Sequence, residues 1–218
     1  MISSKKDIAL VIGSGSHAKV VISILKENFI NKKIIIYSKN IIYPDEKIFD
    51  IPIQTSESLI NDLQAEAEAY IAIGDNIERA YWYNELKKIN FSMPNLLASS
   101  AILDSHVDLG QANIICHKAY LGPGAQLKDN NLINTASILE HDVSVGSHNH
   151  FAPGSISLGS VSVENFNFIG SQSVVKEKIK IGNNIVVGAG AIILNNIEEH
   201  GSVYVGNPGL KMLKGKKI

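Results

Sequence analysis

The sequence is poor in cysteine, in long apolar runs and in excess charge of either sign. The single cysteine, Cys116, excludes an internal disulfide, so we expect a reducing, cytoplasmic compartment. The first apolar run, Ile8 to Ile12, is far too short for a signal-peptide core or a membrane span, and we expect no membrane insertion. The 20 basic and 21 acidic residues nearly cancel, which argues against nucleic acid as a partner.

The first part of the chain, residues 1–94, alternates segments typical of strands with segments typical of helices. The expected strands are residues 8–12, 33–37 and 70–74, and the expected helices are residues 18–26, a short helix ending near 60, and residues 76–89. The strands are apolar throughout, as in a parallel sheet buried on both faces. The alternation predicts a small Rossmann-like α/β domain.

From residue 95 the chain follows a six-residue repeat. Stepping by six from Leu103 to Ile193 meets sixteen positions, and all except Ser157 are apolar. Three hexapeptides close one triangular turn, so residues 18 apart stack and the apolar residues fill the prism in layers. The pattern predicts an all-β, hexapeptide-repeat parallel β-helix over residues 95–210, with a local distortion at Ser157. A basic tail, residues 211–218, follows.

A histidine flanked by carboxylates, Glu140-His141-Asp142, is the strongest catalytic candidate in the repeat. A carboxylate fixes the tautomer of an imidazole and raises its basicity, which suits a general base in acyl transfer. Gly159 stacks one turn above His141, leaving space for a thioester and a backbone N–H for the developing oxyanion. Whether Glu140 or Asp142 orients the ring stays open. No metal site is predicted, because His148 and His150 form only an i, i+2 pair.

A glycine turn, Gly13-Ser14-Gly15-Ser16-His17-Ala18, follows the first strand and opens a helix. A helix N-terminus favours phosphate, and glycine lets a ligand approach the backbone. The second strand ends in Tyr37-Ser38-Lys39 and lacks the acidic residue of a full dinucleotide site. A half-site for one nucleotide diphosphate is therefore the preferred interpretation, and a tight turn without a ligand is the alternative.

Together these segments resemble the sugar O- and N-acetyltransferases of the sialic acid O-acetyltransferase type. That group includes the enzymes that acetylate UDP-4-amino sugars on the way to bacillosamine. The resemblance rests on the glycine turn, on Ala72-Ile73-Gly74-Asp75-Asn76 with Arg79, on Asn134-Thr135 followed by Ile138 to Asp142, and on Val205-Gly206-Asn207-Pro208. It implies a left-handed β-helix, an exception to the usual crossover hand. It also implies a homotrimer with active sites between neighbouring coils.

The resemblance further implies roles for matched positions. His141 matches the general base and Asp142 its acidic partner. Positions matched to the acetyl-CoA site are His150, Gly159, Ser171 and Ala189, and positions matched to the sugar-nucleotide site are Gly13, Ser14, Gly15, Tyr37, Ser38 and Gly74. Relatives that use UDP-sugars often carry acidic residues near Tyr37 and Ser38, and this chain does not.

Three functions remain open at this stage. The glycine turn favours acetyl-CoA-dependent N-acetylation of a nucleotide-linked 4-amino sugar in bacterial surface glycan biosynthesis. The alternatives are O-acetylation of sialic acid or a related sugar, and a binding or scaffold protein without turnover. The sequence does not specify the sugar, the nucleotide or the acetylated atom. The tail lysines either meet the phosphates of coenzyme A or are simply solvated.

Overall fold

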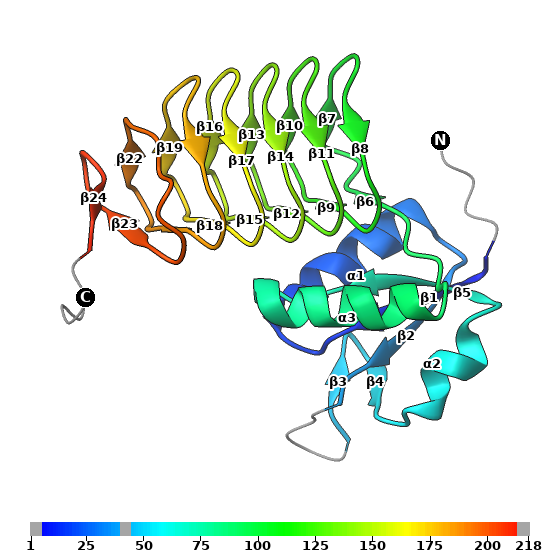
Figure 1. Cartoon of the computed structure of the whole chain (residues 1–218). Helices are drawn as coiled ribbons and strands as arrows, with labels where there is room; N and C mark the ends of the chain where they lie inside the picture. The colour runs from blue at the N-terminus through cyan, green and yellow to red at the C-terminus, as the bar shows by residue number, and fades with distance from the viewer. Residues whose placement is uncertain (1–5, 40–44, 213–218) are drawn as a thin grey trace. The chain divides into compact units, whose positions relative to one another are not determined.

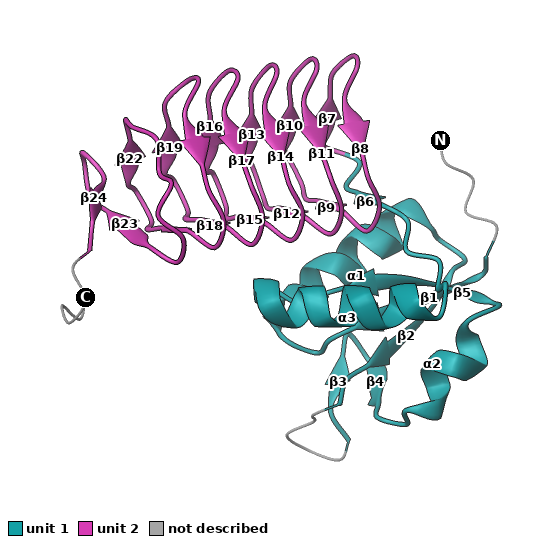
Figure 2. Ribbon diagram, viewed as in Figure 1, with its two compact units in different colours: residues 1–99 teal, residues 100–218 magenta. Residues whose placement is uncertain are grey.

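The computed structural model describes residues 6–39 and 45–212 and separates into two compact units, residues 1–99 and 100–218 (Figure 2). Three of the tail lysines, Lys214, Lys216 and Lys217, lie outside the described residues. No helix in the described part of the chain is long and apolar enough to cross a bilayer.

Unit 1 is built on a sheet of order β3-β4-β2-β1-β5 (Figure 1). Its elements are β1 (Ile8–Ile12), α1 (Ser16–Asn28), β2 (Lys33–Tyr37), β3 (Lys47–Ile48), β4 (Ile51–Gln54), α2 (Ser58–Leu63), β5 (Ala67–Ile71), α3 (Asn76–Lys88) and β6 (Leu96–Leu97). The central strand β1 pairs in parallel with β2 and β5, and α1 packs on β1 while α3 packs on β5. The carboxyl ends of the three parallel strands therefore share one edge, where ligands of such sheets bind.

The third strand runs from Ala67 to Ile71, so it begins and ends three residues earlier than the expected 70–74. The sequence pattern does not indicate this early start, because Glu68 places a carboxylate inside a buried strand, which is unusual. The structure pairs Glu68 with Lys32 in a buried ion pair, and the Tyr70 hydroxyl donates to the same carboxylate at 3.0 Å. A buried charge is tolerated where it is paired and hydrogen-bonded in this way.

Unit 2 is a three-sided prism of two-residue strands stacked in rows (Figure 1). The first face holds β7 (Ile102–Leu103), β10 (Tyr120–Leu121), β13 (Ile138–Leu139), β16 (Ile156–Ser157), β19 (Val174–Val175) and β22 (Ile192–Ile193). The second face holds β8 (Asp108–Leu109), β11 (Gln126–Leu127), β14 (Ser144–Val145), β17 (Ser162–Val163) and β20 (Lys180–Ile181). The third face holds β9 (Ile114–Ile115), β12 (Leu132–Ile133), β15 (His150–Phe151), β18 (Phe168–Ile169), β21 (Val186–Val187), β23 (Val203–Val205) and β24 (Leu210–Lys211).

Every strand of the first and second faces pairs in parallel with the strand 18 residues away. The apolar repeat positions point inward, and Leu121, Ile133 and Leu139 are among those with no exposed surface. Fully burying one such side chain contributes roughly 1.5–3 kcal/mol. The six-residue period of the sequence is thus confirmed as the spacing of the layers in the core.

Each corner of the prism carries one residue in the left-handed region, three positions after the apolar anchor. The non-glycine members are His106, Ala112, Lys118, Asn130, Ala136, Asp142, His148, Ser160, Phe166, Gln172, Lys178 and Asn184. This conformation costs about 1–2 kcal/mol for an ordinary L residue. The coil imposes it because a strand of two residues must turn sharply before the next strand begins.

A column of buried asparagines supports the corner between the second and third faces. The side-chain oxygens of Asn113, Asn131 and Asn149 accept the backbone N–H of the asparagine 18 residues later at 2.8–2.9 Å. The oxygen of Asn167 accepts from Ile185 at 2.7 Å. These bonds satisfy corner amides that the strand ladders leave out. The six-residue apolar pattern of the sequence does not reveal this ladder.

Ser157 does not distort the coil, so that prediction is wrong. Its strand keeps register with β13 below and β19 above, and Ser157 itself is fully buried between Leu139 and Val175. The hydroxyl has no hydrogen-bond partner among the described residues. A serine is smaller than the aliphatic residue it replaces, so the backbone ladder continues unchanged around it.

Candidate active site

The histidine–carboxylate pair lies at the corner that joins the first and second faces. His141 follows β13 by two residues, and Asp142 occupies the left-handed corner position with φ 59°. The turn brings the Asp142 Oδ2 atom to 2.9 Å from the His141 Nδ1 atom. No hydrogen bond joins Glu140 to His141 among the described residues. Of the two neighbouring carboxylates, it is therefore Asp142 that contacts the ring.

Both side chains face outward, with 60% of His141 and 67% of Asp142 exposed. Gly159 lies directly against the ring, and a Cβ placed on it would be 2.5 Å from His141 Cε1. Its backbone N–H has no partner within the described part of the chain. The corner thus combines an accessible imidazole, a carboxylate on one ring nitrogen and an open N–H beside the other.

The remaining residues predicted for acetyl-CoA lie on other edges of the same prism. His150 lies on the third face in β15, where its Nε2 atom is 3.2 Å from Asn134 Nδ2 and its ring contacts the Phe168 ring edge-on. Ser171 and Ala189 stack at the corner between the third and first faces. Within one chain, the structure brings His141, Asp142 and Gly159 together and leaves these three residues apart from them.

The glycine turn of unit 1 has the geometry of an anion site. Gly13 adopts φ +104° and donates its N–H to the Tyr37 carbonyl at 2.8 Å. A Cβ on Gly13 would be 2.8 Å from a carbon of Ile73, so only glycine fits. Gly15 caps α1 without a side-chain hydrogen bond. The Ala18 N–H donates to the Gly15 carbonyl at 2.9 Å, and the N–H groups of Ser16 and His17 have no partner among the described residues.

A buried arginine fixes the loop that follows β5. Arg79 donates to the carbonyls of Ile73 and Gly74 at 3.2 and 3.0 Å and to Asn76 Oδ1 at 2.7 Å. Burial lowers the pKa of Arg79 to about 10, partly opposed by Asp75, so it remains charged at neutral pH. These bonds hold Gly74 at the edge of the sheet where β1 and β2 also end.

A cavity of about 180 Å³ opens at that edge. It is lined by Ile12, Gly13, Tyr37, Ser38, Lys39, Ile73, Glu78, Tyr81 and Trp82. Three of the residues predicted for the sugar nucleotide line this cavity, namely Gly13, Tyr37 and Ser38. The other three, Ser14, Gly15 and Gly74, lie outside its lining. The sequence analysis missed the contribution of α3. The run Tyr81-Trp82-Tyr83 was the available signal, because aromatic side chains on one helix turn often wall a binding site.

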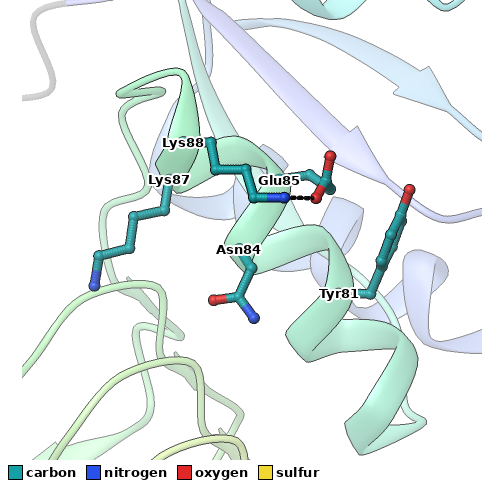
Figure 3. A pocket seen from close by; sticks show the side chains of 5 residues that line it. All are labelled: Tyr81, Asn84, Glu85, Lys87 and Lys88. Atoms are coloured by element: carbon teal, nitrogen blue, oxygen red, sulfur yellow. Dashed lines mark hydrogen bonds and ion pairs between the residues drawn. The ribbon is translucent and has the colours of Figure 1, made fainter.

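A larger hollow of about 480 Å³ on α3 is a weaker candidate. Figure 3 shows that its lining comes from one helix, with Tyr81, Asn84, Glu85, Lys87 and Lys88 as its side chains. Lys88 pairs with Glu85 at 2.6 Å at the surface. A hollow formed by one helix offers no convergent groups from a second element, so it does not define a site.

Two other chemistries find no support in the described residues. No group of three His, Cys, Asp or Glu side chains there is placed to hold a metal ion. Burial raises the pKa of the Cys116 thiol to about 12, which keeps it protonated and makes it a poor nucleophile.

Both units are similar to known proteins. Residues 9–86 match the family model of the PglD N-terminal domain. No curated protein matches the sequence significantly. Among solved structures, a histidine-to-asparagine variant of perosamine N-acetyltransferase from Caulobacter crescentus, in complex with CoA and GDP-perosamine, is 25% identical. The match has a TM-score of 0.86 and covers 94% of this chain and 97% of that one.

Two further structures share the fold. The acetyltransferase domain of PglB from Neisseria gonorrhoeae, in complex with acetyl coenzyme A, is 24% identical with a TM-score of 0.87, covering 95% of this chain and 100% of that one. WeeI from Acinetobacter baumannii is 21% identical with a TM-score of 0.87, covering 94% and 99%. The predicted fold, a Rossmann-like domain followed by a left-handed parallel β-helix, is confirmed. The predicted resemblance is confirmed with it: residues 9–86 match the PglD N-terminal domain, and nearly the whole chain is similar to a sugar N-acetyltransferase of known structure.

Proposed function

We propose that the protein transfers an acetyl group from acetyl-CoA to the amine of a nucleotide-linked 4-amino sugar in bacterial surface glycan biosynthesis. The observation that carries the proposal is the 2.9 Å contact between His141 and Asp142 beside the open N–H of Gly159. The similar Caulobacter enzyme, whose structure holds CoA and GDP-perosamine, supports the choice of donor and of acceptor class.

The chemistry follows from the corner geometry. Asp142 accepts a hydrogen bond from Nδ1–H of His141, which leaves Nε2 as a proton acceptor. The amine nitrogen attacks the thioester carbonyl and gives its proton to Nε2, while the Gly159 N–H stabilises the oxyanion. When the C–S bond breaks, the imidazolium returns the proton to the sulfur of coenzyme A. No covalent enzyme intermediate is formed.

The acceptor is assigned to unit 1. The open N–H groups at the start of α1, with Gly13, Ser14 and Gly15, suit a diphosphate. The base is assigned to the cavity beside Tyr37 and Ser38, with Gly74 at its edge. Positioning of this kind converts a bimolecular reaction into an effectively unimolecular one and supplies much of the rate.

A homotrimer completes the site in this proposal. His150, Ser171 and Ala189, assigned to acetyl-CoA, lie on edges other than that of His141, so a second copy must bring the two sets together. The outward column of the first face is apolar and consists of Ile102, Tyr120, Ile138, Ile156, Val174 and Ile192. The corresponding column of the second face is polar and consists of Asp108, Gln126, Ser144, Ser162 and Lys180. An apolar column of this length suits contact with another copy.

We also propose that the protein acts in the cytoplasm. The one cysteine is free and buried, as in proteins of reducing compartments.

A panel of acceptors tests the proposal. UDP-, dTDP- and GDP-linked 4-amino sugars and free sialic acid are incubated with acetyl-CoA, and release of the CoA thiol is followed with the acetylated product identified by mass spectrometry. We expect turnover with at least one amino sugar nucleotide. Turnover of free sialic acid alone would replace the proposal with O-acetylation. Absence of turnover with every acceptor would favour a scaffold without catalysis.

A further inference from the structure

Tyr37, a residue of the unit 1 cavity lining, carries a buried hydroxyl without a protein partner. The residue has no exposed surface, and its hydroxyl makes no hydrogen bond to any described residue. Its ring packs edge-on against Trp82 with centroids 5.5 Å apart, which fixes its direction. A buried hydroxyl without a partner costs about 1–3 kcal/mol. An unsatisfied hydroxyl on a residue that lines a cavity therefore points to a ligand that bonds to it.

Lys39 lines the same cavity and is held by two aromatic rings. Its Nζ atom lies 5.4 Å from the centre of the Tyr81 ring and 5.2 Å from that of the Trp82 ring. It also donates to the Tyr81 hydroxyl at 3.3 Å and lies 4.0 Å from Glu57. The hydrogen bond to Tyr81 is the main cause of a raised pKa for Lys39, so the ammonium stays charged. The side chain remains half-exposed, and its ammonium has N–H donors beyond the one that bonds to Tyr81.

The same residues border a second cavity, of about 190 Å³, beside α2. The two cavities share Tyr37, Lys39, Tyr81 and Trp82. These four side chains therefore form a partition between them, to which β2 contributes the polar groups and α3 the aromatic rings.

We infer that Lys39 and Tyr37 read the edge of the nucleobase, and that Lys39 selects bases with a carbonyl at that edge. The inference rests on the proposed function, because it assumes that the acceptor is a nucleotide. Lysine donates hydrogen bonds and accepts none. Uracil, thymine and guanine present an acceptor oxygen where cytosine and adenine present an amino donor. The amino bases would therefore place N–H groups against an ammonium.

The two residues have different roles. A hydroxyl both donates and accepts, so Tyr37 strengthens binding of either kind of base without choosing between them. Only Lys39 discriminates.

Matched pairs of nucleotides test the inference by isothermal titration calorimetry on the full chain. UDP is compared with CDP, and GDP with ADP, because each pair differs in carbonyl against amino groups; dTDP is included as a further carbonyl base. We expect the better-bound pair to favour the carbonyl base by about tenfold or more, as for a hydrogen bond to a charged group. Lys39→Gln should remove that preference, since an amide both donates and accepts. Tyr37→Phe should weaken both members of the pair about three- to tenfold and keep the preference.

Two controls isolate the effects. Lys33→Gln removes an exposed lysine at the other end of β2, and Tyr83→Phe removes a hydroxyl of α3 that lines neither cavity. Both should bind nucleotides as the wild type does. Equal affinity of the wild type for UDP and CDP and for GDP and ADP would overturn the inference and leave the proposed function intact. A preference that survives Lys39→Gln would do the same. No binding of any nucleotide would overturn the proposed acceptor itself.

Discussion

At the scale of single residues, the candidate site depends on a corner that forces two neighbouring side chains to meet. Successive residues of a flat strand point to opposite faces. Asp142 escapes this because the coil holds it at φ 59°, and its carboxylate turns back onto His141. Gly159 contributes by lacking a side chain. The site is therefore made by the left-handed corner and by the stacking interval of 18 residues.

Asp142→Asn tests the carboxylate. An amide keeps the shape but stabilises the imidazolium poorly, so we expect kcat/KM to fall about ten- to a hundredfold, less than for a buried triad because this pair is solvent-screened. Glu140→Gln should change little, since Glu140 makes no bond to the ring. Steady-state kinetics across pH measure both. An equal loss in the two variants would contradict the assigned role of Asp142.

Gly159→Ala tests the space beside the ring. The added methyl would overlap the His141 imidazole and displace it, and a shift of about 1 Å in a catalytic group can cost about a hundredfold in rate. We expect the thermal midpoint to change little, because the ring is exposed and can move. Ser160→Ala, one residue later, is the control. Full activity of Gly159→Ala would show that this space is not used.

His17 gives a prediction about stability and pH. Burial, with a smaller contribution from Arg79, lowers its pKa from 6.5 to about 4. Between these values the unfolded chain binds more protons than the folded chain, so stability falls as the pH drops from about 6.5 to about 4. Denaturant unfolding of His17→Asn should show a shallower loss over this window than the wild type. An unchanged slope would contradict the assignment.

At the scale of elements, the asparagine ladder is the part of the β-helix that the repeat pattern did not reveal. The period of six identifies inward apolar residues, but Asn113, Asn131 and Asn149 are as buried as those and were hidden by their polarity. They are recognisable only by the 18-residue interval together with the backbone amides they meet.

Asn149→Ala tests the ladder. The side chain accepts from Asn167 N–H at 2.8 Å and donates to the Glu164 carbonyl at 2.8 Å. Its loss leaves buried groups unpaired, and we expect about 2–4 kcal/mol of destabilisation by chemical denaturation. Gln126→Ala on the exposed second face should cost less than about 0.5 kcal/mol. Similar values for both would show that the ladder contributes little.

Strong periodicity made most of the fold predictable, and the weaker signals explain what was missed. The coil register, the glycine turn and α3 followed from apolar spacing and turn residues. The early start of β5 was hidden by Glu68, whose partner Lys32 is distant in sequence. The predicted lining of the unit 1 cavity was incomplete for the same reason, because Trp82 contacts Tyr37 only through the packing of α3 on the sheet. Contacts between distant segments leave no local pattern.

At the scale of the whole molecule, one chain holds the proposed base and the proposed donor groove on different edges of its prism. A mixing experiment follows. His141→Asn lacks the base and Ser171→Trp blocks the groove, so each alone should be nearly inactive. When they are co-assembled, some interfaces combine the intact corner of one copy with the intact groove of the other. We expect thiol release to recover partly. Mass measurement identifies the assemblies that contain both variants. If thiol release does not recover in them, the shared site is contradicted.

The central claim is that acetyl transfer occurs at His141, and the transfer rate of His141→Asn tests it most directly. CoA thiol release is measured with the best acceptor of the panel, on protein whose assembly mass and CoA affinity match the wild type. We predict that kcat falls about 10²–10⁴-fold, as for loss of a general base, while both binding properties persist. A variant that transfers acetyl groups at the wild-type rate would contradict the account.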